Sequence, residues 1–146
     1  MAELIAGAAV MLILEPIMRR LGSRGTISLS IFITGLAALV IALAPSLEVA
    51  LIGAALTGAG WNANNVAGLR FFTERTSADD MGATTAYYEI IFIAMFVGPM
   101  FGSLIASLGV PLVGVLLIGA GMRLVASLFS HYGLSIFGKA RVRPTI

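Results

Sequence analysis

Five uninterrupted apolar stretches follow one another along the chain and indicate its architecture. They are residues 2–18, 26–44, 47–69, 83–108 and 110–130. A helix that crosses the hydrocarbon core of a bilayer needs about 20 predominantly apolar residues, within a range of about 17 to 25. The stretches lack the alternation of barrel strands, and a spanning segment must satisfy its own backbone hydrogen bonds. The pattern therefore predicts an all-α, polytopic transmembrane bundle of five spans.

Composition supports a membrane setting and argues against other classes of protein. Hydrophobic residues make up 59% of the chain and charged residues only 11%, with a mean hydropathy of +1.02, so a soluble globular domain is excluded and the lipid bilayer is the expected partner. The basic residues flank apolar spans, and no nucleic-acid partner is expected. The chain has no cysteine, which removes disulfides and thiolate chemistry. We expect no cofactor and no metal site.

The basic residues gather on one side of the predicted bundle. The connections after the first and third spans and the tail hold Arg19, Arg20, Arg24, Arg70, Arg75, Lys139, Arg141 and Arg143, whereas the other two connections hold none. By the positive-inside rule, the basic side is cytoplasmic. We therefore expect an integral protein of a plasma membrane, such as a bacterial inner membrane, with its N-terminus outside. A five-helix membrane domain would cover residues 1–132, and a basic cytoplasmic tail would cover residues 133–146.

The sequence RRLGSR after the first span resembles a loop motif of a transporter family. In the major facilitator superfamily, a tight cytoplasmic turn of pattern G-x-L-x-D-R-x-G-R-R joins two helices. Arg20, Gly22 and Arg24 match its first Arg, its second Gly and its last Arg. Where the pattern has its leading Gly, its Asp and the first of its paired Args, the chain has Glu15, Arg19 and Ser23. Such departures are typical of the second copy of the loop, between the eighth and ninth helices.

Two further stretches fit that placement. ALIGAALTGAGWNANN, residues 50–65, is similar to the tenth helix of the family, and GPMFGSLIA, residues 98–106, resembles its G-P-x-x-G-G glycine motif. The resemblance covers nearly all of the chain and implies the C-terminal portion of such a transporter, from about the eighth to the twelfth helix. It implies alternating access around a small solute, with the missing N-terminal helices of the same transporter as partners.

Other functions remain open from the residues alone. A non-transporting helical scaffold or assembly subunit could use the same fold, and a small five-helix transporter half could dimerise. An intramembrane enzyme is not expected, because the spans contain no G-x-S-x-G, no H-E-x-x-H and no paired aspartates.

Two charged residues lie deep within the predicted spans, well away from the span ends. Charges there cost about 2.5 to 3.5 kcal/mol on insertion scales, so Glu89 and Arg123 call for an explanation. Each lies about seven residues from the basic side, roughly 10 Å deep. We expect an intramembrane ion pair between them; the alternatives are that Arg123 snorkels to the headgroups or that Glu89 couples to protons.

The third span carries a stripe of small and polar residues. Gly53, Thr57, Gly60 and Asn64 share one helical face, with Trp61 and Asn65 on its flank. Close helix packing would explain the stripe. A solute cavity lined by Thr57, Trp61, Asn64 and Asn65 is the alternative, because the tenth helix lines the transport path in the resembled family.

Two other spans have simpler patterns. Gly98 and Gly102 form a G-x-x-x-G around Pro99, which predicts close packing and a kink in the fourth span. The second span has no charge and no amide, and we expect it to face lipid. Near the interface at the end of the first span, Glu15 precedes Arg19 by one helical turn, which predicts a structural ion pair.

Overall fold

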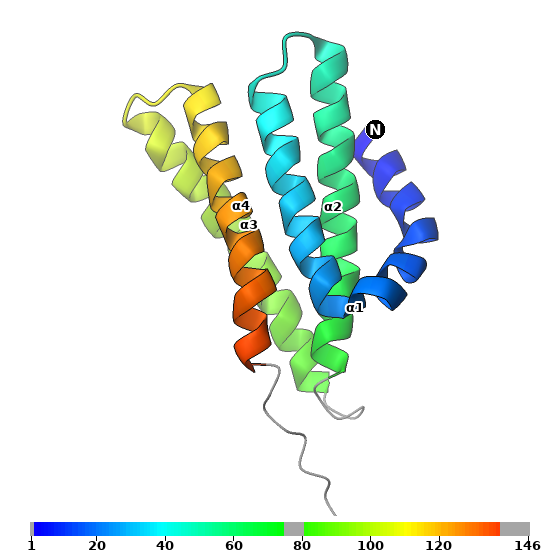
Figure 1. Ribbon diagram of the computed structural model, residues 1–146. Coiled ribbons are helices and arrows are strands. Elements are labelled where there is room, and N and C mark those ends of the chain that lie inside the picture. The colour runs from blue at the N-terminus through cyan, green and yellow to red at the C-terminus, as the bar shows by residue number, and fades with distance from the viewer. Residues whose placement is uncertain (1, 75–80, 138–146) are drawn as a thin grey trace, which may run out of the picture.

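The computed structural model describes residues 2–74 and 81–137, and every element in these ranges is an α-helix (Figure 1). There are four helices: α1 (Ala2–Ala42), α2 (Leu47–Thr73), α3 (Met81–Ser107) and α4 (Leu112–Phe137). The predicted all-α class is confirmed. The predicted count of five separate helices differs from this result, because the first two predicted spans belong to the single element α1.

A bend at Gly22 divides α1 into two limbs. Gly22 has φ 69° and ψ 169°, whereas helical geometry continues on both sides of it. The positive φ lies in the left-handed region, which glycine enters without steric cost. The neighbouring leucine and arginines are good helix formers, so the predicted loop over residues 19–25 is reduced to one non-helical residue. The first limb approaches the bend and the second returns alongside α2 (Figure 1).

Three of the described helices are long and apolar enough to cross a membrane. The apolar segments are Glu3–Ala42, Thr84–Ser107 and Leu112–Tyr132. The helix α2 is not among them, since glycines and three asparagines interrupt its apolar residues. The chain therefore has the character of a membrane protein.

The helix α2 lies between the two limbs of α1, and glycines allow each approach (Figure 1). A Cβ on Gly58 would collide with the backbone of Glu3 in the first limb. On the other side, a Cβ on Gly53 would meet Ile41 and one on Gly60 would meet Thr34, both in the second limb. Because glycine has no side chain, the α2 backbone comes close to both limbs.

The second limb of α1 is the central element of the bundle, which contradicts the expectation that it faces lipid. It packs against both α2 and α4. Ala37 and Thr26 are almost completely buried. A Cβ on Gly35 would lie 3.0 Å from Leu124 of α4. Charge-free apolar segments suit lipid and protein neighbours equally, and here small residues decide in favour of protein contacts.

The helix α3 is peripheral. Its packing against the rest of the bundle is sparse, and it exposes large apolar side chains, among them Phe92, Phe96, Met100 and Phe101. Its main anchor is Tyr87, which is 7% exposed and lies against Phe72 of α2 with ring centroids 5.3 Å apart. An apolar helix of this kind matches a lipid environment.

Candidate functional site

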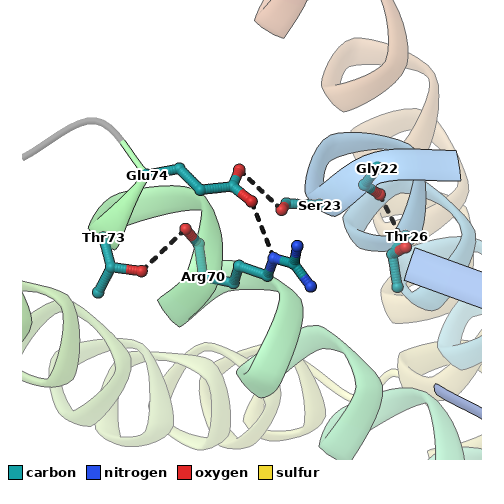
Figure 2. A network of polar contacts seen from close by, with 6 residues as sticks. All are labelled: Gly22, Ser23, Thr26, Arg70, Thr73 and Glu74. Atoms are coloured by element: carbon teal, nitrogen blue, oxygen red, sulfur yellow. Dashed lines mark hydrogen bonds and ion pairs between the residues drawn. The ribbon is translucent and has the colours of Figure 1, made fainter. Parts of the chain in front are cut away.

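One end of the bundle gathers polar residues from separate parts of the chain. The bend of α1 and the C-terminal end of α2 meet through Glu74 (Figure 2). The Ser23 hydroxyl donates to Oε2 of Glu74 at 2.9 Å, and Nε of Arg70 donates to Oε1 of Glu74 at 2.8 Å. One carboxylate therefore holds the bend against α2.

The bend has its own hydrogen bonds. The hydroxyl of Thr26 donates to the carbonyl of Gly22 at 2.8 Å (Figure 2). The hydroxyl of Ser30 donates to the carbonyl of Thr26 at 2.7 Å. Both side chains are almost fully buried. These bonds to carbonyls one turn earlier satisfy the hydroxyls inside the bundle and supply a partner for the carbonyl at the bend.

Arg24 connects the bend of α1 to α4 at the same end of the bundle. Its Nη2 donates to the carbonyl of His131, in the last part of α4, at 2.8 Å. A guanidinium near the C-terminal end of a helix is favourable because the helix dipole places partial negative charge at that end. Ser23, Arg24, Glu74 and His131 therefore place the segments after the first, third and fifth predicted spans at one end of the bundle.

The predicted loop-motif residues have separate roles. Gly22 forms the bend and Arg24 bonds α4, while Arg20 is exposed. The pair predicted between Glu15 and Arg19 is confirmed, with Nη2 of Arg19 at 2.8 Å from Oε1 of Glu15. Arg75 and residues 138–146 lie outside the described residues.

The small residues of the α2 stripe are contact positions. Gly53 and Gly60 face the second limb of α1, and the hydroxyl of Thr57 donates to the carbonyl of Gly53 at 3.0 Å. The packing interpretation thus holds for these two glycines. Thr57 and Asn64 are half-buried and Trp61 is 42% exposed.

Asn65 holds an unsatisfied polar atom. Its side-chain oxygen Oδ1 is buried and has no hydrogen-bond partner among the described residues. Its backbone carbonyl accepts a 3.1 Å bond from the hydroxyl of Tyr87 in α3. By contrast, Asn62 donates from Nδ2 to the carbonyl of Gly58 at 3.0 Å. An orphaned buried acceptor is uncommon in folded proteins and calls for an explanation. Asn65 is therefore the predicted cavity residue with the clearest chemical signature.

Glu89 and Arg123 are not paired in the structure. Nη1 of Arg123 donates to the carbonyl of Gly119, one turn earlier in its own helix, at 3.4 Å. Within residues 2–74 and 81–137, the ion pairs found are those of Glu15 with Arg19 and of Glu74 with Arg70. Both Glu89 and Arg123 are exposed, since α3 and α4 have only a few contacts with each other.

The glycines predicted to pack α3 closely have open surroundings. A Cβ on Gly98 would meet nothing within 4 Å, and one on Gly102 would lie 3.7 Å from Val115, an ordinary contact. Pro99 lies inside α3. The close helix contact expected at this G-x-x-x-G is not formed by any described helix.

The sequence pattern did not single out several of the polar contacts. Ser28 and Ser127 bond each other across α1 and α4, and Glu74 joins α1 to α2. Isolated serines in apolar segments are too common to mark a site. Thr26 and Ser30 share one face of the helix and Ser28 lies on nearly the opposite face. A run of buried hydroxyls on two faces is the signal that favours protein neighbours on both sides.

Comparisons with protein-family models, with curated proteins and with solved structures find no match to this chain.

Proposed function

We propose that the chain is part of a secondary active membrane transporter that moves a small solute by alternating access. In this proposal the two limbs of α1 and the helices α2, α3 and α4 each cross the membrane once. A limb of about 20 residues is about 30 Å long, which is the thickness of the hydrocarbon core. The basic end is cytoplasmic, in a plasma membrane, and the N-terminal helices of the same transporter complete the solute path.

The observation that carries the proposal is the buried, unpartnered Oδ1 of Asn65. Leaving a buried acceptor unsatisfied costs about 1 to 3 kcal/mol. That cost is recovered when a donor arrives, and a small solute with N–H or O–H groups is such a donor. Asn65 lies in the least apolar helix, between elements suited to the membrane, where polar residues mark solute and ion pathways.

The bend of α1 supports the same proposal. In secondary transporters, alternating access is largely a rigid rocking of helix groups. Gly22 divides α1 into limbs on two sides of α2, so the limbs can move as separate bodies around one residue. Glu74 and Arg24 hold the bend at the basic end, where an inward gate would close.

The test measures solute uptake by cells from which the native gene is deleted, with and without re-expression of that gene. Re-expression is expected to restore uptake of one class of small solute from a radiolabelled panel. Asn65→Ala is expected to lower that uptake about tenfold or more, whereas Asn62→Ala is the matched control, because the Asn62 amide bonds its own helix. An antibody to the C-terminal sequence normalises membrane abundance.

An immunoblot with the same antibody distinguishes the transporter proposal from its main alternative. A two-repeat transporter predicts a band at about two to three times the 15.2 kDa of this chain. A band at the size of the chain, together with unchanged uptake of every solute, would overturn the proposal and favour a helical scaffold subunit.

A further inference from the structure

A groove separates the first limb of α1 from α2 near the basic end. Its volume is about 250 Å³, and it is lined by Met11, Leu14, Glu15, Met18, Val66 and Arg70. Leu14 and Met18 are buried and form an apolar cluster with Ala63, against which Val66 packs. The groove therefore has an apolar floor, and its charged residues are one carboxylate and one guanidinium.

The groove runs along the helix axis. Its α1 residues recur at intervals of three and four, so they share one face of the first limb. From Met11 to Met18 the helix rises about 10 Å. On α2, Arg70 lies one turn beyond Val66, toward the basic end, and on α1 Glu15 lies between Leu14 and Met18. Arg19, bonded to Glu15, lies one turn nearer the bend. A ligand with a charged head and an apolar chain fits this order of residues.

The charge at this end favours an anionic head. In the described part of the chain, the arginines here are Arg19, Arg20, Arg24 and Arg70, and the acidic residues are Glu15 and Glu74. The side chain of Arg70 is 50% exposed and bonds Glu74 through Nε. Its two Nη atoms have no hydrogen bond within the described residues, and Figure 2 shows them directed away from Glu74. They are available to a phosphate, which guanidinium groups bind in a forked geometry.

We propose that this groove binds an anionic phospholipid, with the phosphate on Arg70 and Arg19 and the first part of an acyl chain over Met11, Leu14, Met18 and Val66. Basic sites between membrane helices at the interface are suited to anionic lipid headgroups. The apolar floor selects a lipid over a soluble phosphate. This inference goes beyond the transporter proposal and depends only on the membrane setting.

Native mass spectrometry of the full chain, purified in detergent, tests the site. The probes are phosphatidylglycerol and phosphatidylcholine with the same acyl chains, and sn-glycerol 1-phosphate as the soluble competitor. Phosphatidylglycerol is expected to bind at least about fivefold more tightly than phosphatidylcholine. Each basic group near an anionic headgroup contributes about a fivefold factor in affinity. The soluble competitor is expected not to displace it at equal concentration.

Substitutions separate the contribution of charge to lipid binding from the contribution of the shape of the groove. Arg70→Gln and Arg19→Gln are each expected to weaken phosphatidylglycerol binding about fivefold. Val66→Phe fills the groove without changing charge, and it is expected to weaken both lipids. Arg123→Gln removes an exposed arginine from α4 and serves as the matched control with unchanged binding. Circular dichroism and gel filtration check that each variant is folded.

Three results would overturn the site. These are equal binding of the two lipids, an equal loss in Arg123→Gln and Arg70→Gln, and displacement by sn-glycerol 1-phosphate as effective as by the lipid. Because Asn65 takes no part in the groove, a failure here leaves the uptake experiment unaffected.

Discussion

Ser28 and Ser127 exchange two hydrogen bonds across the contact between α1 and α4. The Ser28 hydroxyl donates to the Ser127 carbonyl at 2.9 Å, and the Ser127 hydroxyl donates to the Ser28 carbonyl at 2.8 Å. Both side chains are buried. Small hydroxyl residues let two backbones approach and satisfy their own polar groups at the same contact. This reciprocal pair connects the second limb of α1 to the last helix.

Ser28→Ala and Ser127→Ala are each expected to lower the free energy of unfolding by about 1 kcal/mol. The two losses are expected to add within about 0.5 kcal/mol in the double mutant, because each hydroxyl donates to a backbone carbonyl that the other substitution leaves in place. Unfolding in mixed detergent micelles measures these values. Ser107→Ala is the control, because Ser107 is exposed and bonds the carbonyl of Leu104 in its own helix. Losses no larger than that of Ser107→Ala would contradict the two bonds.

Gly22→Ala is expected to lower the free energy of unfolding by about 1 to 2 kcal/mol, because a Cβ is strained at a φ of 69°. Gly121→Ala is the matched control. It lies inside α4 where a Cβ would meet nothing within 4 Å, and alanine there is expected to stabilise the helix by up to about 1 kcal/mol. The same micelle unfolding assay applies, and equal effects of the two substitutions would argue against a left-handed Gly22.

Gly58→Ala is expected to displace the first limb of α1 from α2, because the new Cβ would collide with the backbone of Glu3. The expected loss is about 1 to 3 kcal/mol, as for other overpacked contacts. Gly98→Ala has open space around its Cβ and is expected to cause no loss. Proteolysis at the first limb reports the displacement, and unchanged protection in Gly58→Ala would show that this contact is loose.

Glu74→Ala and Glu15→Ala each remove an i,i+4 ion pair with an arginine. Glu15→Ala is expected to cause little loss, because its pair with Arg19 is exposed to solvent. Glu74→Ala also removes the acceptor of Ser23, so we expect a further loss of about 1 kcal/mol. Unfolding at low and at high salt separates the two parts, since salt screens the exposed ion pair. Equal losses would mean that the bond from Ser23 adds nothing.

Cysteine labelling tests the expected orientation, because the chain has no cysteine of its own. Leu21→Cys lies beside the bend and is half-exposed, and Ser46→Cys lies in the turn before α2, at the opposite end of the bundle (Figure 1). A membrane-impermeant maleimide is expected to label Ser46→Cys in intact cells and Leu21→Cys only after permeabilisation. The reverse pattern would invert the orientation predicted from the arginines.

Local patterns predicted the helices well. The turn at residues 45–46 and the break at Gly109, with φ 86°, follow from Pro45 and from a glycine between apolar runs, because these signals act within a few residues. The same reasoning predicted the contact of Arg19 with Glu15. It also predicted a loop over residues 19–25, whereas in the structure only Gly22 leaves helical geometry.

Local sequence patterns did not predict the contacts between helices. Residues of similar type have different neighbours: Gly58 contacts the first limb, Gly60 the second, and Gly98 nothing within 4 Å. The expected partner of Arg123 was Glu89, but in the structure its hydrogen bond is to Gly119. Depth in a span can be counted along one helix, whereas the rotation of a helix against its neighbours cannot.

The sequence by itself determined an all-helical chain with apolar segments of membrane-crossing length and arginines concentrated on one side of those segments, because hydropathy, glycine and charge act locally. Only the tertiary structure decided that α2 lies between two limbs of α1, that Ser28 meets Ser127, and that Oδ1 of Asn65 is buried without a partner. In an apolar environment many helix faces bury similar area. Close approach at small residues and the need to satisfy each buried polar group therefore select the arrangement.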